Sequence, residues 1–185
     1  MKQFNNFKAE KAYSRREILP AGGYVCNILS AKEEQLSWGS RLVLAIDIAE
    51  GDKAGFFKKD FDENTREDRK WRGTFRINIP KDDGSEQDGW TMRAFKNFIW
   101  AVEASNPGYT WNWDEKTLKG KKIGVVYRER EWAMDDRTGW TTEAGKAESV
   151  DDIRSGSFKM LKPKPLKDRP VASNPAEDED DQLPF

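Results

Sequence analysis

The chain has 185 residues, 36% of them hydrophobic and 35% charged, and its formal net charge is −1. No apolar run approaches the roughly 20 residues that a membrane-spanning helix needs, so we expect a soluble protein with no membrane contact. One cysteine, Cys26, and no histidine exclude an internal disulfide, a cysteine-based zinc cluster and Ser-His or Cys-His catalysis. The first residues lack the apolar stretch of a signal peptide, which predicts a cytoplasmic protein.

Three strands are expected in the first half of the chain, over residues 24–31, 40–48 and 71–79. In the second strand Leu42, Leu44 and Ile46 alternate onto one face, which is the period of a half-buried strand. The third strand alternates in the same way and ends before a proline. The charged stretch 51–70 between them is long enough for a binding loop or a short helix.

The period changes to that of a helix over about 88–105, where Phe95, Phe98 and Val102 fall on one face. Two further strands are expected, over 122–130 and 140–150, joined by a hairpin-type turn. Residues 151–156 then close a single domain, which we place at residues 1–161. Three strands, one helix and two strands is the order of the OB-fold, a five-stranded barrel with its helix between strands three and four. Other small α+β barrels have similar strands.

The end of the chain differs in composition from the rest. A Pro-rich linker over 162–176 leads into residues 177–185, which carry five acids and no base. Residues 1–176 therefore hold 32 bases against 28 acids, a charge of +4. A disordered acidic tail kept for solubility is one interpretation. The apolar ending at the free carboxylate favours a peptide that docks on a partner, through Asp178, Asp180, Asp181, Leu183, Pro184 and Phe185.

This ending resembles the C-terminal tail of bacterial and phage single-stranded DNA-binding proteins, although Gln182 and Leu183 stand where many relatives have an apolar residue directly after the acids. The runs 21–25, 44–51 and 118–124 are also similar to those of phage-encoded OB-fold single-stranded DNA-binding proteins. The resemblance implies a protein that protects single strands in phage DNA replication or recombination, inside the host cytoplasm. It also implies that the tail recruits replication or recombination proteins.

A protein that holds single-stranded DNA needs cations that follow the phosphates and aromatic faces on which bases stack. Aromatic residues interleaved with arginine occur on the third strand, on the fourth strand and its following loop, and in the loop after the first strand. The candidate DNA-binding residues are Trp38, Arg41, Trp71, Arg72, Arg76, Tyr127, Arg128, Arg130, Trp132 and Trp140. Each aromatic could instead belong to the core. Trp90 and Trp100 on the helix are expected to pack, and Trp111 and Trp113 could close the bottom of the barrel.

Catalysis is not expected. The acids between Asp60 and Asp68 alternate with lysines and arginines, which indicates a neutralised surface loop and not a magnesium site. No phosphate-binding loop or nucleophile elbow is present. We therefore expect a non-enzymatic protein without a cofactor. The alternative is an OB-type module that binds a protein partner and no DNA. Whether the chain forms a homo-oligomer is left open by the sequence.

Overall fold

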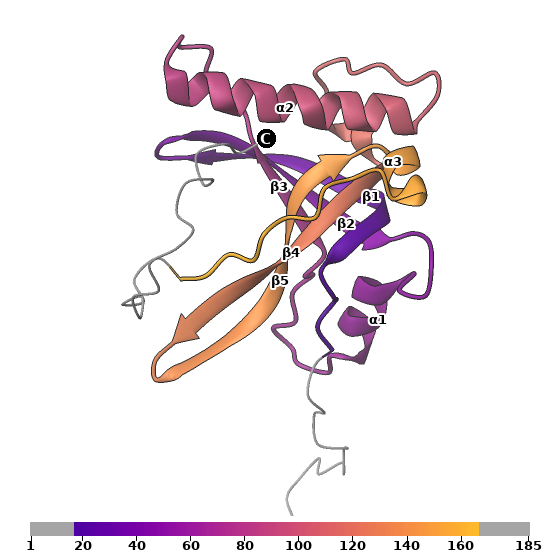
Figure 1. Cartoon of the computed structure of the whole chain (residues 1–185), viewed down its shortest axis with the longest axis vertical. Coiled ribbons are helices and arrows are strands. Elements are labelled where there is room, and N and C mark those ends of the chain that lie inside the picture. The colour runs from indigo at the N-terminus through magenta and orange to yellow at the C-terminus, as the bar shows by residue number, and fades with distance from the viewer. Residues whose placement is uncertain (1–16, 167–185) are drawn as a thin grey trace, which may run out of the picture.

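The computed structural model describes residues 17–166. Its centre is an antiparallel sheet of five strands in the order β3-β2-β1-β4-β5 (Figure 1). The strands are β1 (Gly22–Leu36), β2 (Gly39–Ile48), β3 (Thr74–Asn78), β4 (Lys122–Met134) and β5 (Arg137–Glu148). All five predicted strands are therefore confirmed, but β1 and β4 run further than expected and β3 is shorter. The acidic tail and most of the proposed linker lie outside the described residues.

Four helical segments accompany the sheet: α1 (Phe56–Glu63), α2 (Glu86–Ser105), the 3-10 turn η1 (Glu115–Leu118) and α3 (Val150–Ser155). The predicted helix is α2, between β3 and β4, and it begins where the Ser85 hydroxyl accepts a hydrogen bond from Asp88 N. For the charged stretch 51–70 the sequence allowed a binding loop or a short helix, and the chain forms the short helix α1 there. The segment expected to close the domain after β5 forms the helix α3. None of the helices described is long and apolar enough to cross a membrane.

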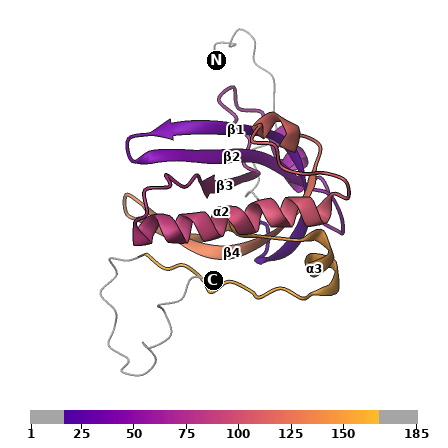
Figure 2. The ribbon, with the colours of Figure 1, turned by 90° about the horizontal axis from the view of Figure 1, so that it is seen from above.

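The core lies between the sheet and α2. The alternating residues of β2, Leu42, Leu44 and Ile46, are all buried, as the sequence predicts. From α2, Phe98 stacks on Phe75 of β3 with 6.0 Å between the ring centroids. At the other edge of the sheet, Asn97 Nδ2 of α2 donates to the carbonyl of Ala147 in β5 at 2.9 Å. The helix thus contacts both edge strands, and Figure 2 shows it from above, lying between β3 and β4.

The sheet is open between β3 and β5. Among residues 17–166, the ladders join β3 only to β2 and β5 only to β4. A closed five-stranded barrel is therefore not what the structure shows. Beyond Tyr127, β5 is the only one of the five strands that pairs with β4, and the two form a long hairpin that extends away from α2 (Figure 1).

A segment that follows α3 crosses the sheet next to this hairpin (Figures 1 and 2). We call residues 157–166 the strap. The ladder between β1 and β4 ends at Tyr127, so β1 leaves the edge of β4 beyond that residue free. The strap pairs with this edge. Lys164 N donates to Glu129 O at 2.9 Å, and Glu131 N donates to Lys164 O at 2.9 Å. Covering a strand edge in this way satisfies its backbone groups. The first residues of the proposed linker are thus docked on the domain.

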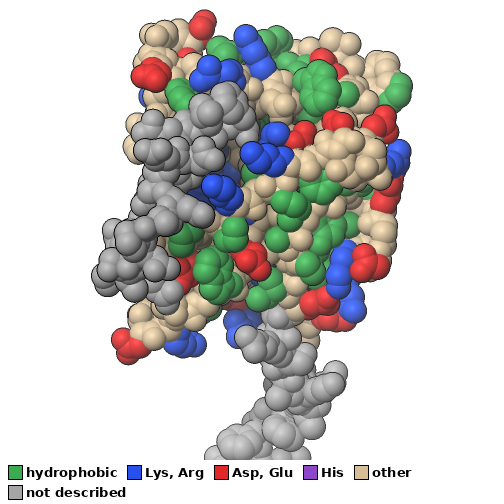
Figure 3. Space-filling model, in the orientation of Figure 1, with side chains coloured by type: hydrophobic (Ala, Val, Ile, Leu, Met, Phe, Trp, Pro, Cys, Tyr) green, Lys and Arg blue, Asp and Glu red, His purple; other side chains and the backbone are tan. Residues whose placement is uncertain are grey.

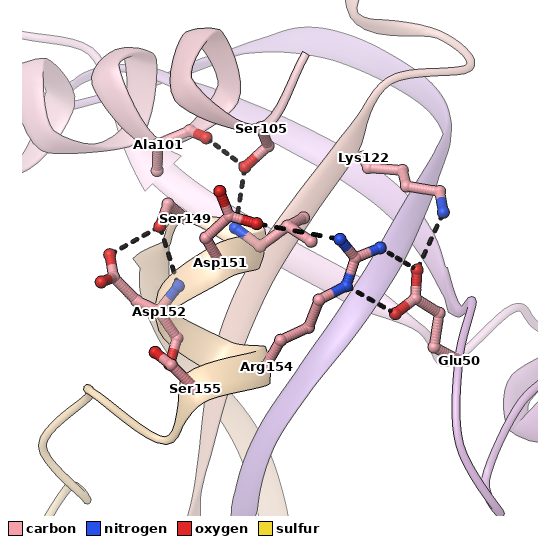
Figure 4. A network of polar contacts seen from close by, with 10 residues as sticks. Glu50, Ala101, Ser105, Lys122, Ser149, Asp151, Asp152, Arg154 and Ser155 are labelled. Atoms are coloured by element: carbon pink, nitrogen blue, oxygen red, sulfur yellow. Dashed lines mark hydrogen bonds and ion pairs between the residues drawn. The ribbon is translucent and has the colours of Figure 1, made fainter. Parts of the chain in front are cut away.

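Ion pairs fix α3 to the sheet (Figure 4). Glu50 accepts hydrogen bonds from Arg154 of α3 at 2.7 and 3.0 Å and from Lys122 of β4 at 2.9 Å. The hydrogen bonds from Arg154 and then Lys122 lower the pKa of Glu50 to about 2. Ser105 at the end of α2 accepts from Val150 N at 2.9 Å, so α2, α3 and β4 are held as one unit.

Candidate nucleic-acid interface

A groove of about 660 Å³ lies between the two edge strands of the open sheet. One wall is formed by Thr74, Arg76 and Asn78 of β3, and the other by residues 141–145 of β5. Alternation explains the first wall, because Phe75 points into the core and its neighbours must point to the opposite face. Phe56, half-buried at the start of α1, adds an aromatic ring to the lining.

Positive charge is concentrated in this groove. Among the described residues its lining holds five cationic side chains and a single carboxylate, Glu143. The cations are Arg72, Arg76, Arg128, Arg130 and Lys164. Figure 3 shows a face of the molecule on which bases are interspersed with acids and apolar side chains. Four of the five cations are candidates from the sequence, and the fold brings them together from β3, the segment before it and β4.

Glu143 organises the cations of the second wall. Its Oε1 lies 3.0 Å from Arg128 Nη2 and 3.5 Å from Lys164 Nζ, and its Oε2 lies 3.5 Å from Arg130 Nε. Arg128 and Glu143 are direct cross-strand partners, so their side chains share one face of the hairpin. One carboxylate cannot neutralise three cations, and a second anion such as a phosphate would be attracted to the same place.

The cations of the first wall are held less tightly. Arg72 lies 3.5 Å from Asp60 of α1. Arg76 is exposed, and its Nη1 donates to the Thr74 hydroxyl at 2.9 Å. Within residues 17–166 no ion pair joins Arg76 to an acid. This guanidinium can therefore turn toward a ligand in the groove without breaking a salt bridge.

Tyr127 does not offer the stacking face that the sequence suggested. The residue is 3% exposed, and its ring packs edge-on against Tyr24 at 5.7 Å and in a tilted arrangement against Phe57 at 6.2 Å. Burial raises the pKa of the Tyr127 phenol well above its usual value. The residue nevertheless belongs to the groove lining, and its hydroxyl has no hydrogen-bond partner among the described residues. Tyr127 is thus a core residue with one polar atom left for a ligand or water.

Trp71 is a half-buried residue beside the groove. Its indole nitrogen donates to the carbonyls of Gly73 at 2.9 Å and Ile46 at 3.2 Å. The ring also packs against Phe61 of α1, with 5.8 Å between centroids. These contacts attach the segment before β3 to the sheet and so position the neighbouring Arg72. Trp71 has this structural role whether or not a base touches it.

The two other aromatic candidates of this region, Trp132 and Trp140, lie on opposite faces of the β4–β5 hairpin. Trp132 follows Arg128 and Arg130 at intervals of two, so it lies on the face of the hairpin that carries these arginines. A Cβ at Gly139, its cross-strand partner, would be 2.9 Å from the indole ring. Trp140 pairs with Glu131 instead, on the opposite face. Trp132 therefore extends the row of the groove cations, and the exposed Trp140 does not.

Neither Trp38 nor Arg41 is part of the groove lining: Trp38 lies at the turn between β1 and β2, and Arg41 of β2 is the cross-strand partner of Asn78 in the groove wall. Trp38 is exposed, and Arg41 donates two hydrogen bonds to Glu34 Oε2 at 2.8 and 3.0 Å.

The helix tryptophans also differ from expectation. Trp90 is half-buried under Arg93, whereas Trp100 is 51% exposed and does not pack in the core. Trp111 packs against the core and Trp113 is exposed.

Among the groove residues that were not anticipated from the sequence are Phe56, Glu143 and Lys164. Phe56 begins a short helix inside a strongly charged stretch, where the sequence allowed a loop equally well. Lys164 stands between Pro163 and Pro165, in a stretch whose composition predicts a tether. Its place in the groove depends on the unpaired edge of β4, which no local pattern reveals.

Comparison with protein-family models gave no match, and comparison with curated protein sequences gave none either.

Proposed function

We propose that this chain is a non-catalytic single-stranded DNA-binding protein built on an open, OB-type barrel. The observation that supports this most is the groove between β3 and β5, with five cations against one carboxylate in its lining. Such a balance attracts a phosphate backbone and releases counterions when the backbone binds. OB-folds are partly open barrels that bind oligonucleotides, and the open side here is where the charge lies.

The arrangement favours single strands over duplex DNA. Apolar surface from Phe56 and Ile18 lines the same groove as the arginines, and Trp132 continues the row of Arg128 and Arg130. In a single strand the base faces are free to stack on such side chains while the phosphates meet the cations. A duplex presents phosphates on its outside but keeps its base faces covered. Contacts of this kind are tolerant of sequence, because every base has a flat face.

The biological setting is proposed from the sequence resemblance. The protein would cover exposed single strands during phage DNA replication or recombination and recruit partner proteins through residues 177–185, which lie outside the described residues. The groove itself requires no metal ion or cofactor for this activity. A protein-binding module without DNA affinity is the outcome that the following experiment would distinguish.

The test replaces two groove cations from β3 and the segment before it. Arg72→Ala with Arg76→Ala should weaken binding to any single-stranded oligonucleotide. The slope of log K against log salt should fall by about 0.7 for each phosphate that the variant no longer neutralises. The matched control is Arg93→Ala with Lys96→Ala on α2, which removes the same charge outside the groove lining. Equal affinities and equal slopes for the two double variants would contradict the proposal.

A further inference from the structure

The strap brings a cation from the C-terminal part of the chain into the groove. We propose that residues 157–166 are part of the single-strand binding surface, and that Lys164 contacts a phosphate of the bound strand. This inference rests on the proposed function and deepens it. It assigns a wall of the site to a segment whose Pro-rich composition suggests only a tether.

The main chain of the strap is fixed where Lys164 enters the groove. Lys164 is hydrogen-bonded through its N–H to Glu129 O and through its carbonyl to Glu131 N, both at 2.9 Å. Its two neighbours are prolines, which have no N–H to donate. Leu166 N then donates to Glu131 Oε2 at 3.2 Å, and Glu131 is only 4% exposed. These bonds fix the backbone on both sides of the lysine and leave its side chain free to move.

An apolar contact holds the strap upstream of Lys164. A Cβ added at Gly145 would clash with Leu161 Cδ1, so the leucine is seated where β5 lacks a side chain. Gly145 falls at the register shift between β4 and β5, opposite Val126 and Tyr127. The bulge and the missing side chain together make room for the strap. Leu161 therefore sets the path by which Lys164 reaches Glu143.

The electrostatics place Lys164 where a phosphate would bind. Its Nζ is 3.5 Å from Glu143 Oε1, the atom that also holds Arg128, and its side chain is half exposed. A phosphate attracted by Arg128 and Arg130 would therefore come within reach of the lysine without any rearrangement of the strap. Binding would add a contact between strap and strand and so stabilise the docked strap. The chain that leads to the acidic C-terminal residues would then be anchored beside the bound DNA.

The first experiment compares two lysines of the strap in the full chain. Lys164→Ala should weaken binding to an oligo(dT) by about three- to tenfold at low salt and lower the salt slope by about 0.7, the value for one phosphate contact on a single strand. Lys162→Ala removes the same charge from an exposed position outside the groove lining and should change the affinity by less than about twofold, since no phosphate contact depends on it.

A second pair of variants tests the path of the strap without changing its charge. Leu161→Ser should lose about as much affinity as Lys164→Ala, whereas Met160→Ser, at an exposed neighbour, should not. Because both effects act through the same lysine, the double variant Leu161→Ser with Lys164→Ala should be no weaker than Lys164→Ala alone. Amide exchange at Lys164 in the unmodified chain should slow when oligo(dT) binds.

The outcomes separate this inference from the proposed function. If the unmodified chain binds oligo(dT) but Lys164→Ala equals Lys162→Ala, and amide exchange at Lys164 is unchanged, the strap is not part of the site and the proposed function stands. Full affinity of Leu161→Ser, or additive losses in the double variant, would also overturn the inference. If the unmodified chain binds no oligo(dT) at any salt concentration, both proposals fail.

Discussion

Replacing Glu143, the one carboxylate that residues 17–166 contribute to the groove lining, should strengthen DNA binding. Glu143 lies among Arg128, Arg130 and Lys164, and a phosphate held by the same cations would sit roughly 6 Å from it. At that distance and an effective dielectric constant of about 60, the two anions repel by about 0.9 kcal/mol, and screening at 0.15 M salt about halves this value. Glu143→Gln should therefore bind oligo(dT) about two- to fivefold more tightly.

The salt dependence gives a second, independent measure. Cations released from Glu143 can each meet a phosphate, so the slope of log K against log salt should steepen by about 0.7 for each additional phosphate that is neutralised. Glu129→Gln is the matched control. Glu129 stands between Arg128 and Arg130 in β4, but it is exposed and outside the groove lining. Both variants change the net charge equally. Fluorescence anisotropy with labelled oligo(dT) measures the affinities. If Glu143→Gln binds like Glu129→Gln, the carboxylate does not compete with phosphate and the reasoning fails.

Three further predictions concern other parts of the chain. Tyr127→Phe removes a buried hydroxyl without a partner, so unfolding by denaturant should show unchanged or higher stability, by up to about 1 kcal/mol; a destabilised variant would mean that the hydroxyl is satisfied. The low pKa of Glu50, about 2, means that its ion pairs stabilise the fold fully above its unfolded pKa near 4.5 and lose this effect as the pH falls toward 2. The stability difference between the unmodified chain and Glu50→Gln should therefore be largest at neutral pH and shrink between about pH 4.5 and 2. A stability difference that stays constant over this pH range would contradict the stabilising role of the ionised Glu50. Deleting residues 177–185 should leave oligo(dT) binding intact or slightly tighter at low salt, because the five acids compete with phosphate. Phe185→Ala should abolish most partner capture in pull-downs; recovery of the same proteins would make the ending a solubility tail.

The sequence predicted the elements whose pattern is set by one buried face. In β2 the alternation of Leu42, Leu44 and Ile46 survives because the core covers only one side of the strand. In α2 the residues Phe95, Phe98 and Val102 take the sheet-facing side, as their spacing predicts. Trp100 follows Phe98 by two residues, which places it roughly 200° around the helix and explains its exposure. Helical period alone would have shown this tryptophan to be outside the core.

The parts of the site that depend on tertiary contacts could not be predicted in the same way. In β4 five consecutive residues, 123–127, are buried, because the core covers one face and the segment around α3 covers the other. The alternation of polar and apolar residues along β4 therefore did not reveal which face of the strand Tyr127 belongs to. Lys164 enters the groove only because β1 leaves β4 early, and Trp140 is separated from Trp132 by the register of one hairpin. The four arginines were found because an outward arginine on a strand keeps its charge at the surface whatever the neighbours are.

A fluorescence titration tests the central claim most directly. The chain has eight tryptophans, and Trp132 lies in line with the groove cations. Bases that stack on indole rings should quench their emission, so adding poly(dT) at low salt should lower the fluorescence, and added salt should restore it as the strand dissociates. Duplex DNA at the same nucleotide concentration should quench less. No quenching by poly(dT), or equal quenching by duplex and single strands, would contradict single-stranded DNA binding by this groove.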